Sequence, residues 1–122
     1  MRIISGTHKG RRIQTPRGLP VRPTTDLCKE ALFNILQHHY HLSDIEVLDL
    51  FAGTGALGFE AASRHASSVT LLEKDKRAHA KLLANYALLQ SSPAPGSVQI
   101  VHRDSLEFLK QQADRSSNLI FI

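Results

Sequence analysis

Residues 46–58 read EVLDLFAGTGALG, and this stretch decides the fold. The apolar run Val47–Phe51 predicts a buried parallel strand, because strands covered on both faces are apolar along their whole length. A glycine-rich turn follows, and the residues from Ala56 onward predict a helix. A strand, a tight glycine turn and a helix form the architecture that binds a charged or phosphorylated cofactor at a helix N-terminus. The stretch therefore predicts an α/β, Rossmann-like fold with a cofactor site at the turn.

The glycines of this turn have separate roles. Gly53 and Gly55 allow backbone angles and a close approach of ligand that a Cβ would prevent. Gly58 lets the helix pack closely on the strand. The spacing alone is not specific, because dinucleotide sites share it.

The residue that discriminates is Asp49, which lies four positions before Gly53, near the carboxyl end of the strand. A carboxylate there would repel a pyrophosphate, whereas it suits a ligand that carries an ammonium and a sulfonium group. That ligand is S-adenosylmethionine (SAM). A nicotinamide or flavin dinucleotide, and a turn that binds no ligand, are the alternatives.

Composition sets the class of protein. A chain of 122 residues, 42% hydrophobic and 21% charged, is expected to form one domain with its own core. No apolar run approaches the roughly 20 residues that span a bilayer. The first residues lack the apolar segment of a signal peptide, so we expect a cytoplasmic protein. A single cysteine, Cys28, excludes an internal disulfide and fits a reducing compartment.

Positive charge is concentrated at the N-terminus, within a net charge of +4. Residues 1–24 contain no acidic residue, and their cationic side chains are Arg2, Lys9, Arg11, Arg12, Arg17 and Arg22. Apolar Ile3 and Ile13 flank two glycines, which predicts a short hairpin or an extended arm. We interpret residues 1–24 as a basic arm that contacts the phosphates of a nucleic acid, and residues 25–122 as the cofactor-binding domain. A solvated, partly ordered segment is the alternative.

The remaining chain alternates between helical and strand patterns. Helices are expected from the Thr24–Asp26 cap to about His39, over Ala56–Arg64 and Lys76–Gln90, and after Asp104; strands are expected at Val69–Leu72, Val98–Val101 and Asn118–Ile122. Right-handed crossovers between these strands give a parallel sheet with helices on both faces.

The first helix carries two features that resemble sites. Its apolar face is expected to comprise Cys28, Ala31, Leu32, Ile35 and Leu36. Cys28 would then pack in the core and would not be a reactive thiol. His38, His39 and His41 do not converge, because neighbouring positions on a helix diverge by about 100°, so no metal site is expected.

Polar residues at the ends of the later strands extend the candidate cofactor site. Glu73 lies 18 residues beyond Gly55, close to the spacing at which an acidic residue meets a ribose; a surface acid is the alternative. The aliphatic stem of Lys74 is suited to pack on an adenine face. Asp104 is interpreted as a helix N-cap, as an acceptor for the adenine amino group, or as both through different oxygens.

Five segments together resemble one known family. They are Ile3–Gly6, Lys9–Arg12, Arg22–Asp26, Glu30–Leu36 and Asp49–Gly58, and the likeness continues through Glu73–Asp75 and Arg103–Ser105. The chain resembles the bacterial 16S ribosomal RNA guanine-N2 methyltransferase family over essentially its whole length. The resemblance implies a Rossmann-like SAM-dependent methyltransferase fold that transfers a methyl group to the exocyclic amine of a guanine.

The resemblance also implies roles for residues. The loop holding the methionine end of SAM would comprise Asp49, Phe51, Ala52, Gly53, Thr54 and Gly55. Glu73 would hold the ribose, Asp104 with Ser105 the adenine edge, and the basic arm would grip ribosomal RNA.

One departure concerns the catalytic motif. In this family the fourth strand runs into Asn/Asp-Pro-Pro-Tyr/Phe, which holds the target amine and stacks on the base; here that motif would be expected just after Ile122. The sequence therefore predicts no catalytic residue within positions 1–122, a sheet lacking its C-terminal strands, and a chain that is inactive alone. A non-catalytic SAM- or RNA-binding fragment and a DNA-base methyltransferase remain alternatives, since phosphate contacts carry no sequence information.

Overall fold

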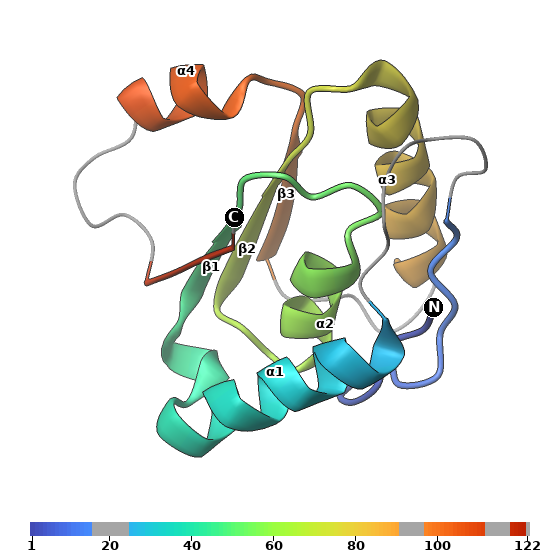
Figure 1. The fold of residues 1–122 in the computed structure, drawn as a ribbon, viewed down its shortest axis with the longest axis vertical. Helices are drawn as coiled ribbons and strands as arrows, with labels where there is room; N and C mark the ends of the chain where they lie inside the picture. Colours follow the sequence, from blue (N-terminus) through green and yellow to red (C-terminus); the bar gives the residue numbers. More distant parts are fainter. Residues whose placement is uncertain (16–24, 91–96, 112–117, 122) are drawn as a thin grey trace.

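The computed structural model describes residues 1–15, 25–90, 97–111 and 118–121. The elements are α1 (Asp26–His39), the 3-10 turn η1 (Leu42–Asp44), β1 (Glu46–Asp49), α2 (Ala56–Ser63), β2 (Ser68–Leu72), α3 (Lys76–Leu89), β3 (Ser97–Val101), α4 (Ser105–Lys110) and β4 (Leu119–Phe121) (Figure 1). The strands form one parallel sheet in the order β3-β2-β1-β4. The predicted α/β architecture is confirmed.

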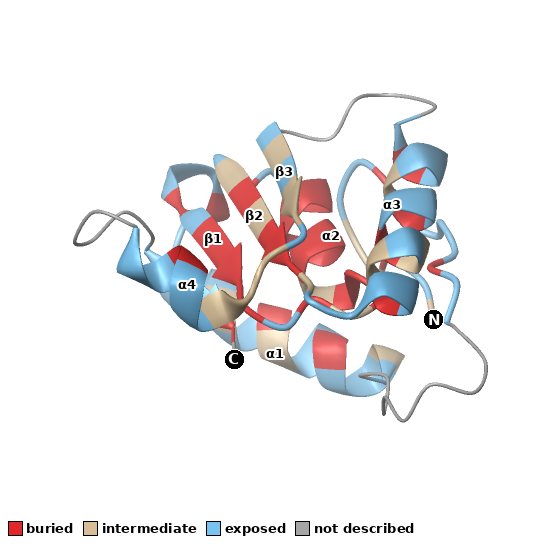
Figure 2. Ribbon diagram, turned by 90° about the horizontal axis from the view of Figure 1, so that it is seen from above, coloured by how far each residue is buried: buried red, intermediate tan, exposed pale blue. Residues whose placement is uncertain are grey.

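Strand β1 separates two apolar layers. Val47 belongs to the larger core, which includes Phe33 of α1, Phe59 of α2 and Leu82 of α3. The next residue, Leu48, faces the opposite side and packs in a smaller cluster with Leu72 and Phe108 of α4. Figure 2 shows the buried residues concentrated on β1, β2 and α2. Because successive residues of a strand point to opposite faces, Val47 and Leu48 anchor β1 in both layers. The strand ends at Asp49 and not at Phe51 as expected, since Leu50 and Phe51 belong to the turn and Phe51 is exposed.

The sequence-based face of α1 is right for Leu32 and Leu36, which pack against the core, and wrong for its other residues. Cys28 is exposed, and Ile35 is 61% exposed, whereas the fully buried positions of the helix are Lys29 and Phe33. The helix is turned by about one residue, or roughly 100°, relative to the expected face. The cause is the ammonium of Lys29, which ion-pairs with Glu60 and donates to the carbonyl oxygen of Arg2. Apolar periodicity does not reveal a lysine that is buried with its partners.

The N-terminal residues form the predicted hairpin. Arg2 and Arg12 are antiparallel bridge partners, and the Ile3 and Ile13 amides donate to carbonyl oxygens of the opposite segment. The side chains of Ile3 and Ile13 are buried in the main core. The hairpin is therefore part of the folded body. Arg17 and Arg22, with the rest of residues 16–24, lie outside the described residues.

Glu60 of α2 fixes this hairpin to the helices. Its two carboxylate oxygens accept from the amides of Ile4 (2.8 Å) and Ser5 (3.1 Å). They also pair with Lys29 Nζ at 3.2 Å and with Arg64 Nε at 2.8 Å. The Glu60 side chain is fully buried. One carboxylate thus joins the hairpin, α1 and α2, with its charge balanced and its lone pairs used.

Gly6 permits the closest approach of the hairpin to α2. Its φ is +89°, and a Cβ there would overlap the carbonyl oxygen of Ser63. We expect Gly6→Ala to lower the free energy of unfolding by about 3 kcal/mol or more, because left-handed strain adds to a clash with backbone. Urea denaturation measures this. Gly10→Ala is the matched control: φ is +85° but nothing lies within 4 Å of the added Cβ, so only the backbone strain remains. Equal effects of the two substitutions would contradict this account.

Asn85 of α3 links the hairpin to the glycine-rich loop. Its Oδ1 accepts from the Gln14 amide (3.0 Å), and its Nδ2 donates to the carbonyl oxygens of Gln14 (3.1 Å) and Thr54 (3.0 Å). Asn85 is 1% exposed, whereas Leu83 on the same helix is 46% exposed. A polar amide is therefore buried here because its hydrogen-bonding groups are used.

Candidate functional site

The candidate site lies where the parallel strands end. Asp49 is the last residue of β1, Glu73 follows β2, and Asp104 lies shortly after β3. Because β1, β2 and β3 are parallel neighbours, their carboxyl ends share one edge of the sheet. In open α/β sheets this edge is where ligands bind.

The glycine-rich loop uses its backbone N–H groups internally. The Phe51 amide donates to Asp49 Oδ1 (3.2 Å) and the Gly53 amide to Glu73 Oε2 (2.8 Å). The Ala52 and Gly55 amides donate to the carbonyl oxygens of Leu72 and Ala52. A dinucleotide turn instead directs such groups at a pyrophosphate. With these N–H groups engaged and two carboxylates attached, the loop is poorly suited to a polyanion and well suited to a cation.

Asp49 is the buried member of this carboxylate pair. It is 4% exposed. Burial raises the pKa of its carboxyl to about 6, opposed by the hydrogen bond from the Phe51 amide and assisted by the negative charge of Glu73. A group whose ionised form is this poorly solvated gains from a nearby cation, because opposite charge favours ionisation. Such groups concentrate at functional sites.

The carboxylate of Glu73 is held by two backbone amides, one from the glycine-rich loop and one from the segment that follows Glu73. Its Oε2 accepts from the Gly53 amide, and its Oε1 accepts from the Asp75 amide (3.1 Å). The carboxylate is therefore oriented at the rim of the loop. Each oxygen keeps a second lone pair that can accept from a ligand hydroxyl.

A hollow of about 220 Å³ opens beside Glu73. It is lined by Leu50, Phe51, Glu73, Lys74, Asp104, Ser105 and Leu106. The structure thus brings together five of the side chains predicted from the sequence, whereas Ala52, Gly53, Thr54 and Gly55 form the adjoining loop. This volume is below the roughly 300 Å³ of the smallest drug-sized sites, so it matches one part of a ligand, such as a nucleoside.

Asp104 caps helix α4 and also faces the hollow. Its Oδ1 accepts from the Leu106 and Glu107 amides, and its Oδ2 lies 3.5 Å from Lys74 Nζ. The hydrogen bond from the Glu107 amide is the main cause that holds the pKa of this carboxyl below its usual value. The N-cap interpretation is confirmed. Acceptance from an adenine amino group stays a prediction, and it would use the oxygen that does not cap the helix.

Two residues of the hollow were missed as site residues. Leu106 is 70% exposed at the hollow. Leu50 supplies a carbonyl oxygen that accepts from the Ser105 hydroxyl (2.6 Å). A backbone carbonyl carries no sequence signal. The exposure of Leu106 follows from its place in the first turn of a short helix, which periodicity alone does not show.

A family model described as "conserved hypothetical protein 95" matches residues 1–122. The chain belongs to this family.

The relatives that resemble the chain carry methyltransferase names. "Ribosomal RNA small subunit methyltransferase D" of Escherichia coli K12 is 38% identical over 122 residues, which are 100% of this chain and 58% of the relative. The protein of that name from Haemophilus influenzae is 44% identical over 111 residues, 91% of this chain and 55% of the relative. A solved structure, a putative methyltransferase from Escherichia coli, matches with a TM-score of 0.73 and 38% identity over 91% of this chain and 56% of that chain. The chain spans little more than half the length of these family members.

The family assignment confirms the resemblance on which the sequence interpretation depends. Some of the basic residues expected to contact RNA lie exposed on the hairpin, namely Arg2, Lys9, Arg11 and Arg12.

Among the described residues no group of three or more His, Cys, Asp or Glu side chains is arranged to hold a metal ion. Nor does any described helix have the length and apolar character needed to cross a membrane.

Proposed function

We propose that this chain is the cofactor-binding portion of a SAM-dependent methyltransferase that modifies the exocyclic N2 of a guanine in 16S ribosomal RNA. The observation that carries the proposal is the pair of carboxylates, Asp49 and Glu73, that occupy the N–H groups of the glycine-rich loop. This arrangement favours a cationic ligand over a dinucleotide. The names of the family relatives support ribosomal RNA as the substrate.

The proposal assigns each part of the cofactor to residues at the sheet edge. Asp49 and the loop through Gly55 attract the ammonium and sulfonium groups of the methionine end. Glu73 accepts from the ribose hydroxyls. Asp104 and Ser105, which line the hollow together with the exposed Phe51, hold the adenine edge, and the stem of Lys74 covers a face of the base.

The bound cofactor would supply an electrophilic methyl group. The residues of this chain orient and enclose the cofactor and exclude water from its methionine end. No residue among positions 1–122 is assigned to orient the guanine amine, whose lone pair is delocalised into the ring. We therefore expect a polypeptide of residues 1–122 to bind SAM without transferring its methyl group.

Titration calorimetry tests the cofactor assignment. The chain is titrated in turn with SAM, with S-adenosylhomocysteine and with NAD. SAM is expected to bind more tightly than S-adenosylhomocysteine, because the latter lacks the sulfonium charge, and NAD is expected not to bind. Tight NAD binding without SAM binding would overturn the interpretation of Asp49.

The affinity for SAM is expected to depend on pH below about 6. The free Asp49 carboxyl has a pKa of about 6, and a bound ammonium group lowers that pKa, so binding releases a proton in this range. The association constant should therefore fall by up to about tenfold per pH unit as the pH drops below 6, and should level off above about 7. Calorimetry at pH 5, 6, 7 and 8 measures this. An affinity that is flat from pH 5 to 8 would exclude Asp49 as the partner of the cation.

A methylation assay tests the substrate. The complete protein is incubated with radiolabelled SAM and with naked 16S RNA, assembled small subunits or DNA of matching sequence, and the modified nucleoside is identified by mass spectrometry. N2-methylguanine in RNA is the expected product. Methylation of a DNA base in preference to RNA would favour the second candidate substrate, which the exposed arginines of the hairpin do not exclude.

A further inference from the structure

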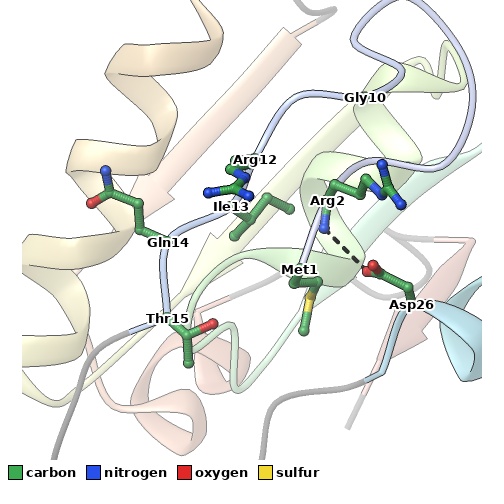
Figure 3. A pocket seen from close by; sticks show the side chains of 8 residues that line it. All are labelled: Met1, Arg2, Gly10, Arg12, Ile13, Gln14, Thr15 and Asp26. Carbon is green, nitrogen blue, oxygen red and sulfur yellow. Dashed lines mark hydrogen bonds between the residues drawn. The ribbon is translucent and has the colours of Figure 1, made fainter.

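A second and larger hollow lies away from the sheet edge, between the N-terminal hairpin and the first turn of α1. Its volume is about 560 Å³, within the range of small-molecule sites. Among its lining residues are Arg2, Gly10, Arg12, Gln14 and Asp26 (Figure 3). It shares no lining residue with the candidate cofactor hollow.

Two arginines occupy opposed backbone positions on the hairpin here. Arg2 and Arg12 are direct bridge partners, and the hydrogen bonds on either side of them are made by their neighbours, Ile3 and Ile13. This is the pairing in which opposed side chains come closest and project from the same face. The isoleucines on the other face are buried, so both guanidinium groups are displayed on the exposed face.

This like-charge pair is not neutralised within the described chain. Residues 1–15, 25–90, 97–111 and 118–121 provide no ion pair to either guanidinium. Like charges directly opposite each other on two strands are unfavourable, and an anion between them removes the repulsion. The closest acid at the hollow, Asp26, uses its Oδ1 to accept from the backbone amide of Arg2 (3.1 Å).

Asp26 gives the hollow a second kind of partner. It extends from the first turn of α1 beside Arg2, as Figure 3 shows, and it is only partly buried. A carboxylate would repel a free inorganic anion, but it accepts readily from a hydroxyl or a base N–H group. Two cations with one acceptor thus match a ligand that carries both a phosphate and sugar hydroxyls.

We propose that this hollow receives one nucleotide of the RNA substrate, with its phosphate contacted by Arg2 and Arg12 and its ribose 2′-hydroxyl donating to Asp26. The proposal rests on the proposed function, because it takes RNA as the substrate. It adds a site that distinguishes RNA from DNA, which the exposed basic residues alone cannot do.

The phosphate contact is tested by measuring how tightly the protein binds a fluorescent single-stranded RNA. Fluorescence anisotropy gives this affinity over a range of salt concentrations. Arg2→Gln and Arg12→Gln should each lower the affinity about fivefold at 0.1 M salt and reduce the slope of log K against log salt by roughly 0.7, the value for one phosphate contact on a single strand. Lys110→Gln, which removes an exposed cation on α4, is the matched control and should change neither quantity measurably. Equal effects of all three substitutions would overturn the site.

Two further measurements test the ribose contact and the hollow itself. Asp26→Asn keeps the acceptor for the Arg2 amide but weakens acceptance from the 2′-hydroxyl, so it should lower the ratio of RNA to DNA affinity several-fold. An unchanged ratio would contradict the role of Asp26. A nucleoside 5′-monophosphate at millimolar concentration should shift the amide resonances of Gly10 and Arg12, and their constancy would contradict the site.

The outcomes separate this inference from the proposed function. A complete protein that methylates RNA and whose RNA affinity is insensitive to Arg2→Gln and Arg12→Gln would refute the hollow and leave the activity standing. A wild-type protein that neither binds nor methylates RNA would refute both.

Discussion

Glu60→Gln is expected to lower the free energy of unfolding by about 3–5 kcal/mol, because the substitution removes the counter-charge of a fully buried lysine. In the native structure one carboxylate forms ion pairs with Lys29 and Arg64 and accepts from two hairpin amides. A glutamine amide retains one acceptor oxygen and carries no charge. The ammonium of Lys29 then has no counter-charge in its ion pair and is left with neutral oxygen acceptors, such as the carbonyl oxygen of Arg2. Urea denaturation followed by circular dichroism measures the loss.

Two companion variants make this result specific. Glu30→Gln removes an exposed carboxylate from α1, and its effect should be within about 0.5 kcal/mol. The double variant Glu60→Gln with Lys29→Met should recover part of the loss, because it removes the orphaned charge and keeps an unbranched apolar side chain. A Glu60→Gln variant as stable as Glu30→Gln would show that the hairpin is not held by this carboxylate.

Asp49→Asn is expected to have opposite effects on stability and on cofactor binding. The folded pKa of Asp49, about 6, lies above the ordinary value of 3.8, so its ionised form is unfavourable in the folded chain. This cost is absent below about pH 4, grows as the pH rises through 6, and reaches about 3 kcal/mol above it. Asparagine avoids the cost and still accepts from the Phe51 amide. The variant should therefore be more stable than the wild type at pH 8, by up to about 3 kcal/mol, and equally stable at pH 4.

The same substitution should weaken SAM binding about 100-fold at pH 8, because a partly desolvated cation loses its counter-charge. Asp44→Asn, an exposed position in η1, is the control and should alter neither property. Calorimetry and urea denaturation at the two pH values provide both readouts. A variant that binds SAM with wild-type affinity, or one that is less stable at pH 8, would show that Asp49 serves the fold and not the ligand.

The α/β fold and the candidate site edge could be predicted from the sequence because their signals are local. The apolar run Val47–Phe51, which overlaps β1, the glycine turn and the capping residue Asp104 each indicate a backbone conformation within a few positions. The end of each strand is then known, and parallel pairing places those ends together. This is why five predicted side chains line one hollow.

The attachment of the hairpin could not be predicted, because its partners are distant in sequence and polar in type. Lys29, Glu60 and Asn85 are buried only because their partners are buried with them, and a single residue carries no sign of this. The same cause explains the wrong face of α1. A helical wheel places Cys28 inside and Lys29 outside, whereas the ion pair with Glu60 reverses that order.

The attachment of the hairpin to α2 and α3 has a consequence for how fast and how tightly RNA would be captured. An arm that becomes ordered only on binding loses about 1–2 kcal/mol of backbone conformational entropy per residue at that moment. Here Glu60, Ser63 and Asn85 already hold residues 4–14 through hydrogen bonds, so that loss occurs when the chain folds. The hairpin therefore meets its ligand as a preorganised surface. Its encounter rate should be governed by diffusion and charge, and its binding should show a small heat-capacity change with no coupled folding.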